Sequence, residues 1–275
     1  MKISDLKYCY NLVSQNARDL YLADLLLPKE MRDDIIVLHA FHVEITNITL
    51  ASREPMAGEV RLQWWADVVA GKRHEEAEGH PLARALLRLI VKHNLPRSAL
   101  DAKLEAHIFD LYQDPMGDRT MLEGYFGETR SVLFQMAALI IGISPSPDLA
   151  NASGHAGVAT GVVGMLEQMA MHRSSGKIFI PSDLLLAAGI SVSEFMAMPA
   201  SNHNLVVHGV IDLAEEHYQM ALKALLELPQ SARLVFKSLA IVPHYLHRAK
   251  ASPSLVLSGL PASSQFKRQW ALWRF

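Results

Sequence analysis

Hydrophobic residues recur at helical spacing along nearly the whole chain. Over residues 6–24 they fall three, four or seven positions apart, and Pro28 follows as a helix breaker. The next stretch, 29–51, has the same spacing, with apolar members at Ile35, Leu38, Phe41, Ile45 and Ile48. Residues at these intervals share one face of an α-helix. The first 51 residues are therefore predicted to form two long helices, each with a face to bury.

Start and stop signals divide the rest of the chain into further helices. Pro81 suits the first helical position, Gly71 and Gly189 suit the position after a helix, and Asp148 is a candidate N-cap. Helices are expected at about 58–71, 81–96, 97–113, 119–142, 149–172, 182–188, 203–227, 231–250 and 264–274, with one more opened by the capping box of Ser191 and Glu194. No alternating run is long enough for a sheet, so the prediction is an all-α fold of about ten helices.

The amino-acid composition is sufficient for one large hydrophobic core. It has 275 residues, half of them hydrophobic, and no linker rich in glycine, serine or proline, so a single domain over 1–275 is expected. The formal net charge of −2 provides no positive field that would attract nucleic acid. A nucleic-acid partner is therefore not expected.

The single cysteine and the apolar runs bear on localisation. Cys9 has no second cysteine to pair with, which fits a reducing compartment, and the N-terminal residues lack the apolar core of a signal peptide. The longest apolar runs, 131–144 and 155–166, fall short of the roughly 20 residues that span a bilayer. A soluble, cytoplasmic protein is expected, and a peripheral membrane contact stays open.

Four glycines recur at three- and four-residue steps within the predicted helix 149–172. They are Gly154, Gly157, Gly161 and Gly164. Because each glycine in a helix lowers its stability by about 1 kcal/mol relative to alanine, the row indicates that these glycines are needed for packing or for binding. Close approach of a second helix is favoured, and room for a ligand beside the backbone is the alternative.

Histidine and basic side chains are the candidate chemistry. His39 and His42 are one helical turn apart, but a metal needs further ligands, so polar groups in a helical interior are the favoured interpretation. Arg61 could hold an anion, since guanidinium suits phosphate. His172, Arg173 and Lys177 form a basic loop at a helix end, interpreted as solvated surface with an anion contact as the alternative.

The C-terminal stretch "QFKRQWALWRF" places Phe266, Trp270 and Trp273 on one stripe beside basic residues. Packing of this stripe onto the domain is the favoured interpretation. A basic aromatic helix can also lie on a membrane interface or in the groove of a partner.

Several collinear stretches together resemble the squalene/phytoene synthase family. They are "DLYLADLLLPKEMRDDIIVLHAFHVEI", "GEVRLQWWADVVAG", "HPLARALL" and "GKIFIPSDLLLAAGIS", the last resembling that family's loop and short strand. The resemblance implies an isoprenoid-synthase-like helical bundle, in one domain, around a central cavity. It also implies two acidic clusters that hold Mg²⁺, which binds the diphosphate leaving group.

The positions that match those two clusters are not acidic in this chain. The first cluster falls on Thr46, Asn47 and Leu50, and the second on Gln168, Met171 and His172. We therefore expect no metal, no cofactor and no catalytic residue. The candidates for lining a cavity or binding a ligand are Tyr21, His39, Thr46, Asn47, Leu50, Arg61, Gln168, Met171, His172 and Lys177.

A branch of the family, the mitochondrial complex I assembly factors, is similar in the same losses and in "RLQWW", "KHNL" and "HRSSGKIFIP". The leading hypothesis is a non-catalytic assembly factor or scaffold with a protein partner, for example respiratory complex I subunits, at the inner membrane. One alternative is a Mg²⁺-dependent prenyltransferase that uses the displaced acids Asp24, Asp33, Asp34 and Asp67. The other is an isoprenoid- or lipid-binding protein.

Overall fold

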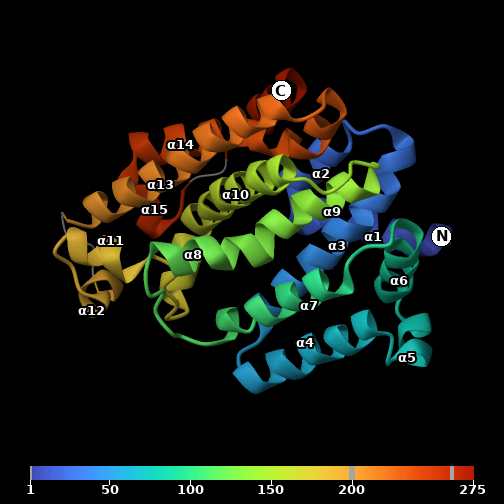
Figure 1. Cartoon of the computed structure of the whole chain (residues 1–275). Coiled ribbons are helices and arrows are strands. Elements are labelled where there is room, and N and C mark those ends of the chain that lie inside the picture. The colour runs from blue at the N-terminus through green and yellow to red at the C-terminus, as the bar shows by residue number, and fades with distance from the viewer. Residues whose placement is uncertain (1, 198–201, 261–262) are drawn as a thin grey trace. The chain divides into compact units, whose positions relative to one another are not determined.

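In the computed structural model, the described residues are 2–197, 202–260 and 263–275. All regular elements in these ranges are helical, so the predicted all-α fold is confirmed (Figure 1). The chain divides into two compact units. Unit 1 comprises residues 1–112, 132–146 and 229–237, and unit 2 comprises residues 113–131, 147–228 and 238–275. The expected single domain and its central cavity stay predictions.

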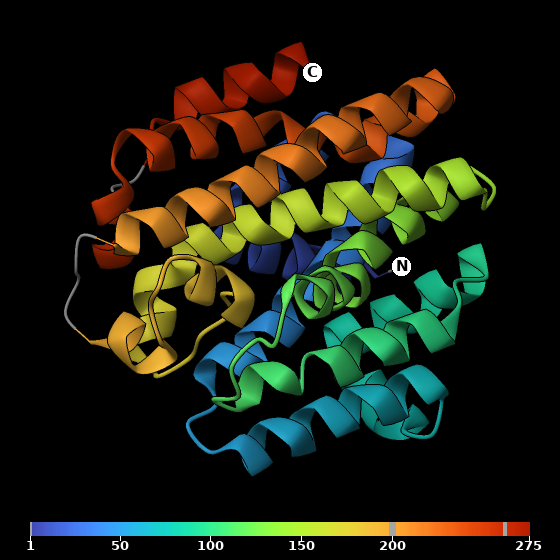
Figure 2. The ribbon, with the colours of Figure 1, turned by 60° about the vertical axis from the view of Figure 1, so that its left-hand side comes forward.

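Unit 1 is built around one long buried helix. Its elements are α1 (Ile3–Asn16), α2 (Arg18–Asp24), α3 (Lys29–Ala51), α4 (Pro55–Ala70), α5 (His74–Gly79), α6 (Pro81–His93), α7 (Arg97–Ala106), η1 (Phe109–Leu111) and α9 (Val132–Ile140). The apolar side chains of α3 are buried against α1, α6 and α9, and α4 runs along α7 (Figures 1 and 2). Phe134 stacks on Phe236 with ring centroids 5.1 Å apart, which joins residues 229–237 to this core.

The helix α3 is also long and apolar enough to cross a membrane by length and composition. However, 72% of its apolar window is buried. Burial of this extent is what a central core helix requires.

Unit 2 is organised by a pair of long helices. Its elements are α8 (Arg119–Phe126), the π-helical turn η2 (Gly127–Ser131), α10 (Pro147–Ser174), α11 (Ser182–Ala187), α12 (Val192–Met196), α13 (His203–Ala224), η3 (Leu225–Glu227), α14 (Val242–Ala251), α15 (Pro253–Ser258) and α16 (Gln265–Arg274). α10 and α13 lie side by side (Figures 1 and 2). The 3₁₀ segment η4 (Gln230–Ile241) precedes α14.

The glycine row of α10 allows close approach at two of its four positions. A Cβ built on Gly157 would lie 2.4 Å from the backbone nitrogen of Ser131, and one built on Gly161 would lie 2.3 Å from the Phe126 ring. Gly154 faces open space, and Gly164 has only an ordinary contact. Close packing of a neighbouring element, the favoured interpretation, is confirmed for Gly157 and Gly161.

Most of the cap predictions are confirmed. Gly71 follows α4 with φ 82°, Gly189 follows α11 with φ 67°, and Pro81 occupies the first turn of α6. Ser191 and Glu194 form both hydrogen bonds of a capping box. These signals succeed because each one satisfies or removes a backbone group at a helix end.

Several helix boundaries differ from the prediction. The segment 6–24 is two helices, because Ala17 leaves the helical region (φ −137°, ψ 64°) after the Asn16 side chain has donated to the Leu12 carbonyl. α4 begins at Pro55 and α10 at Pro147, both earlier than predicted, so Asp148 lies in a first turn and is not an N-cap. Proline accounts for both starts, since its fixed φ suits the first turn of a helix.

Other differences concern the kind of helix. Residues 119–142 contain the π turn η2, and 231–250 is a 3₁₀ segment followed by an α-helix with Pro243 in its first turn. The six-residue α5 is too short for a periodic pattern, and the stretch 177–181 has a bend at Ile180 and does not form the strand that the family resemblance implied. Hydrophobic spacing of three and four residues does not distinguish these helix types.

Candidate functional site

Six of the ten candidate residues lie in unit 1, and three of them lie on one side of α3. His39, Thr46 and Leu50 are seven and four residues apart, which places them on one face, with Asn47 beside it. Thr46 donates its hydroxyl to the His42 carbonyl at 3.0 Å. Thr46 and Asn47 are half-buried and Leu50 is 46% exposed. This face therefore carries a hydroxyl, an amide and an alkyl group where the family resemblance implies carboxylates.

His39 is bound to an acid from the preceding helix. Its Nδ1 lies 2.7 Å from Oδ2 of Asp24, and both side chains are buried. Burial raises the pKa of Asp24, and the charge and hydrogen bond of His39 oppose that rise. Asp24 thus orients the His39 ring, which leaves Nε2 as the nitrogen available for any other contact.

His42 belongs to a different polar network, centred on a lysine with no exposed surface. The Lys103 ammonium lies 3.2 Å from His42 Nδ1 and 3.1 Å from His107 Nε2. His107 Nδ1 is in turn 2.7 Å from Oδ2 of Asp110, which also accepts from Thr49 at 3.4 Å. Because ammonium only donates, both histidine nitrogens beside it accept, and His107 donates from Nδ1 to Asp110.

This network was not predicted from the sequence. Lys103 and His107 are four residues apart on a helix, and Asp110 follows at three, so the spacing in "KLEAHIFD" is a usable signal. What the sequence does not show is that α7 faces α3. The two histidines His39 and His42 therefore serve different acid and amine partners, and they do not form a shared metal site.

The remaining unit 1 candidates are tied to near neighbours. Tyr21 packs edge-on against Tyr10, with ring centroids 6.3 Å apart, and the Arg18 guanidinium lies 5.6 Å from its ring centroid. Arg61 is half exposed, and its guanidinium lies 3.9 Å from a carboxylate oxygen of Glu44. Arg61 therefore already has an acidic neighbour on α3, at the outer limit of ion-pair distance.

The other four candidates lie in unit 2, at the C-terminal end of α10. Gln168, Met171 and His172 are three and four residues apart and share a face, and the His172 ring lies 4.6 Å from that of Phe179. The Lys177 backbone N–H closes the helix by donating to the His172 carbonyl at 2.9 Å. Gly176 adopts φ 77°, where a side chain would be strained.

Arg173 does not behave as a solvated surface residue. It donates to the Ala197 carbonyl at 2.7 Å and to the Leu257 carbonyl at 3.3 Å, and its guanidinium lies 5.2 Å from the Phe195 ring centroid. Burial lowers its pKa. For Arg173, the solvated-surface interpretation of the basic loop is therefore wrong, because the side chain ties α10 to segments distant in sequence.

The prenyltransferase alternative relies on four aspartates outside the two cluster positions, and in unit 1 each of them contacts a different partner. Asp24 binds His39, and Asp33 accepts from Tyr10 at 2.8 Å. Asp34 lies 2.5 Å from the Lys92 ammonium and 2.8 Å from His93, and Asp67 accepts from Arg73. Asp33 and Asp34 do line one cavity with Glu30, but four basic residues line it too: Lys2, Lys29, Arg88 and Lys92.

Mg²⁺, the ion that the fold family implies, does not fit the donors at the matching positions. Mg²⁺ is usually held by carboxylates, and none is present among Thr46, Asn47, Leu50, Gln168, Met171 and His172, whose only side-chain oxygens are neutral. Within the ranges 2–197, 202–260 and 263–275, no three histidine, cysteine, aspartate or glutamate side chains are placed to hold a metal ion.

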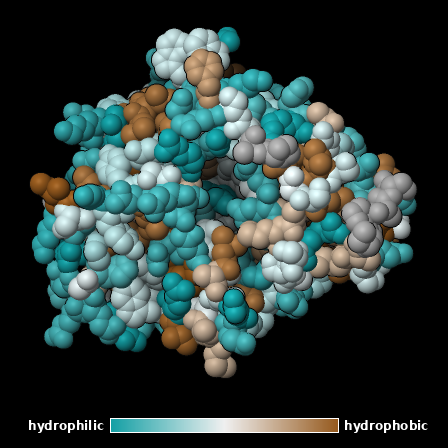
Figure 3. Space-filling model, turned by 180° about the vertical axis from the view of Figure 1, so that it is seen from behind, coloured by the Kyte–Doolittle hydropathy of each residue, from teal (hydrophilic) through white to brown (hydrophobic). Residues whose placement is uncertain are grey.

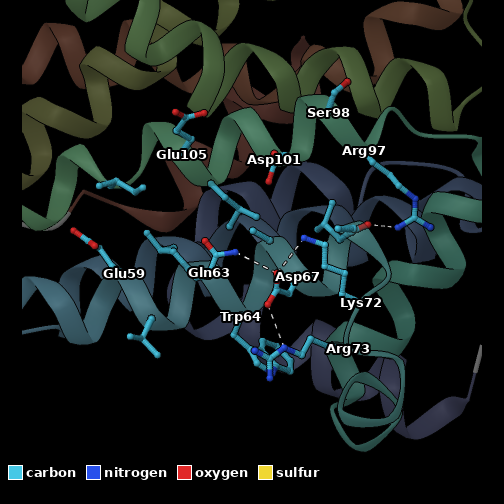
Figure 4. A pocket seen from close by; sticks show the side chains of 17 residues that line it. Glu59, Gln63, Trp64, Asp67, Lys72, Arg73, Arg97, Ser98, Asp101 and Glu105 are labelled. Atoms are coloured by element: carbon cyan, nitrogen blue, oxygen red, sulfur yellow. Dashed lines mark hydrogen bonds and ion pairs between the residues drawn. The ribbon is translucent and has the colours of Figure 1, made fainter.

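A groove of about 750 Å³ lies between α4 and α7 of unit 1 (Figure 4). On the α4 side, the Asp67 carboxylate accepts from Gln63 and Arg73, each at 3.2 Å. Burial alone would raise the pKa of Asp67, but these hydrogen bonds and the charge of Lys72 lower it. Across from them, α7 presents the exposed carboxylates of Asp101 and Glu105.

The aromatic stripe of α16 faces outward, which contradicts its expected packing onto the domain. Phe266 is 73% exposed, Trp270 51% and Trp273 67%, whereas Leu272 on the opposite side is fully buried. Pale and tan side chains stand out at the top of the space-filling view, over the end of α16 (Figure 3). Leu272 and a hydrogen bond of 3.3 Å from Arg268 to the Tyr245 hydroxyl attach this ten-residue helix, and the indoles of Trp270 and Trp273 lie on its exposed side.

Comparison with known proteins identifies relatives of two kinds. A family model described as squalene/phytoene synthase matches residues 13–274. The chain is 28% identical over 245 residues to "NADH dehydrogenase (ubiquinone) complex I, assembly factor 6" of Bos taurus, which covers 88% of this chain and 73% of that protein. It is 22% identical over 242 residues to a phytoene synthase of Cereibacter sphaeroides, which covers 84% of this chain and 67% of that one.

A solved structure supports the fold. The crystal structure of a dehydrosqualene synthase in complex with ligand superimposes with a TM-score of 0.80 at 15% sequence identity, and covers 98% of this chain and 95% of that one. At this identity the likeness establishes the all-α isoprenoid synthase fold and nothing about chemistry.

Proposed function

The chain belongs to the squalene/phytoene synthase family, and from that premise we propose that it is a non-catalytic member that assists the assembly of respiratory complex I. The observation that carries this proposal is the 28% identity to complex I assembly factor 6 across 88% of the chain. An assembly-factor role follows from these relatives, and with it a protein partner of the complex I type.

The chemistry of the matching positions supports the absence of catalysis. Ionising an allylic diphosphate leaves a large negative charge that divalent ions must neutralise. The side chains at both cluster positions are neutral or weakly basic, and Glu44, the acid nearest the first cluster, lies within ion-pair distance of Arg61. A protein with this helical fold but without these carboxylates can still enclose a hydrophobic core and bind a partner through its surface.

The outward indoles of α16 support a site of action at the membrane surface. Tryptophan is favoured at the bilayer interface, where its ring is amphipathic, and the flanking Lys267 and Arg274 suit anionic lipids. We place the protein on the cytoplasmic side, peripheral to the inner membrane, where a complex I intermediate is accessible.

Deletion of the gene in its host tests the proposal. We expect less assembled complex I on native gels and lower NADH:quinone activity, with both restored by the wild-type gene. Normal complex I in the deletion strain would refute the assembly role.

A second assay tests the enzymatic alternative, which the similarity to phytoene synthase supports. The purified protein is incubated with farnesyl or geranylgeranyl diphosphate and Mg²⁺, and pyrophosphate release is measured against a heat-treated sample. No release is expected. Heat-sensitive turnover would establish a prenyltransferase, and an isoprenoid found by mass spectrometry of the extracted protein would support the lipid-binding alternative.

A further inference from the structure

Unit 2 contains a cavity whose charged lining is entirely basic. It measures about 450 Å³ and lies among α14, α15 and the start of α16. Among the described residues that line it, the ionisable side chains are His244, His247, Arg248 and Lys267, and none is acidic. A pocket with this lining favours an anion.

Three apolar side chains, those of Ala251, Leu255 and Leu260, and three serine hydroxyls make up the rest of the lining. The hydroxyls of Ser252, Ser263 and Ser264 belong to the same cavity, and Ser263 Oγ is buried with no hydrogen-bond partner among the described residues. Ser264 precedes α16 without capping it through its side chain, so the first backbone N–H groups of α16 lack that partner. Helix N-terminal N–H groups, hydroxyls and ammonium groups together are the donors that phosphate oxygens accept from.

The position of Lys267 connects this cavity to the aromatic stripe. Phe266, Trp270 and Trp273 are four and three residues apart on the outer side of α16, while Leu272 faces inward. Lys267 lies about 100° around the helix from Phe266, between the outer and the inner side. Lys267 therefore lines the cavity from a position next to the stripe on the same helix.

We propose that this cavity binds the phosphate of an anionic phospholipid headgroup while the stripe of Phe266, Trp270 and Trp273 enters the bilayer interface. The proposal rests on the membrane contact proposed above and adds a specific lipid site to it. A soluble phosphate compound would be recognised by the same donors, but it would leave the neighbouring exposed indoles without a function. The stripe therefore identifies a lipid as the source of the phosphate.

The test is sedimentation of the full-length protein with vesicles of two compositions. One is phosphatidylcholine alone, and the other is phosphatidylcholine mixed equally with phosphatidylglycerol. The wild type is expected to prefer the anionic vesicles. Trp270→Ser with Trp273→Ser is expected to weaken binding to both kinds.

Two variants that each remove one positive charge distinguish a specific headgroup site from general electrostatic attraction to an anionic membrane. Arg274→Gln removes a charge seven residues from Lys267, on the same flank but outside the cavity lining. It is expected to weaken binding to anionic vesicles by about five-fold, the usual effect of one basic residue near an anionic surface. Lys267→Gln is expected to weaken it by about ten-fold or more, since a hydrogen bond to a charged group is lost as well.

Soluble glycerol phosphate serves as competitor. It is expected to weaken anionic-vesicle binding by the wild type and not by Lys267→Gln. Equal losses for the two charge variants, without competition, would overturn the headgroup site and leave the membrane contact standing. Absence of any vesicle binding would overturn both. Binding of glycerol phosphate without vesicle binding would assign the cavity to a soluble ligand.

Discussion

The Lys103 ammonium lies 3.1 Å from His107 Nε2 in a part of unit 1 that solvent does not reach. The pair joins α7 to η1 through Asp110, and to α3 through His42. A buried ammonium is costly unless it donates to acceptors, and here two histidine nitrogens each accept one of its three protons.

Replacing Lys103 with methionine is expected to destabilise the protein by about 1–3 kcal/mol, because the buried ring nitrogens of His42 and His107 would lose the donor that the ammonium provides. Urea unfolding measures the difference. Lys223, an exposed lysine of α13, provides the matched control, and Lys223→Met is expected to change stability by about 0.5 kcal/mol or less. Equal effects of the two substitutions would show that the network does not stabilise the fold.

Asp5 and Arg84 are predicted to make stability depend on pH. Asp5 is fully buried, and two of its contacts with the Arg84 guanidinium measure 2.9 and 2.5 Å. The hydrogen bond from Arg84 lowers the pKa of Asp5 below its usual 3.8, so the folded state holds the proton less tightly than the unfolded state. Its stabilisation is therefore complete above pH 3.8 and is lost as pH falls through the folded-state pKa.

The variant Asp5→Asn tests this dependence. We expect it to be less stable than the wild type at neutral pH, and the gap in unfolding free energy to narrow as the pH falls below about 4. Chemical unfolding curves at a series of pH values measure the gap. A gap of constant size would contradict the ion pair.

Cys9 is expected to be unreactive in the native protein. It has no exposed surface, and burial raises the pKa of its thiol to about 12. The thiolate fraction at pH 8 is then on the order of 10⁻⁴, and the thiolate is the reactive form. Mass spectrometry should find no alkylation at pH 8 without denaturant and one modification in urea, and rapid native labelling would show that α1 opens readily.

Two glycines of α10 should respond oppositely to alanine. Gly161→Ala places a methyl group against the Phe126 ring and is expected to destabilise by about 1–3 kcal/mol. Gly154→Ala meets open space and is expected to stabilise by up to about 1 kcal/mol, because alanine is the better helix former. Thermal unfolding compares the two, and similar shifts for both would indicate that α10 does not pack as closely as described.

The sequence by itself determined the helical class, most helix ends and the family. Helix ends such as Gly71 and the Ser191 box depend on residues a few positions apart, which a linear pattern contains. The same holds for the absence of carboxylates at positions 46, 47, 50, 168, 171 and 172.

Only the tertiary structure decided which polar side chains meet. Lys103 reaches His42 across 61 positions, and Arg173 binds the Leu257 carbonyl across 84. It also decided that α16 buries Leu272 and turns its indoles outward, although the aromatic stripe is the more apolar side of that helix. Local spacing fixes the faces of a helix, but which face is buried depends on the neighbours that the fold brings to it.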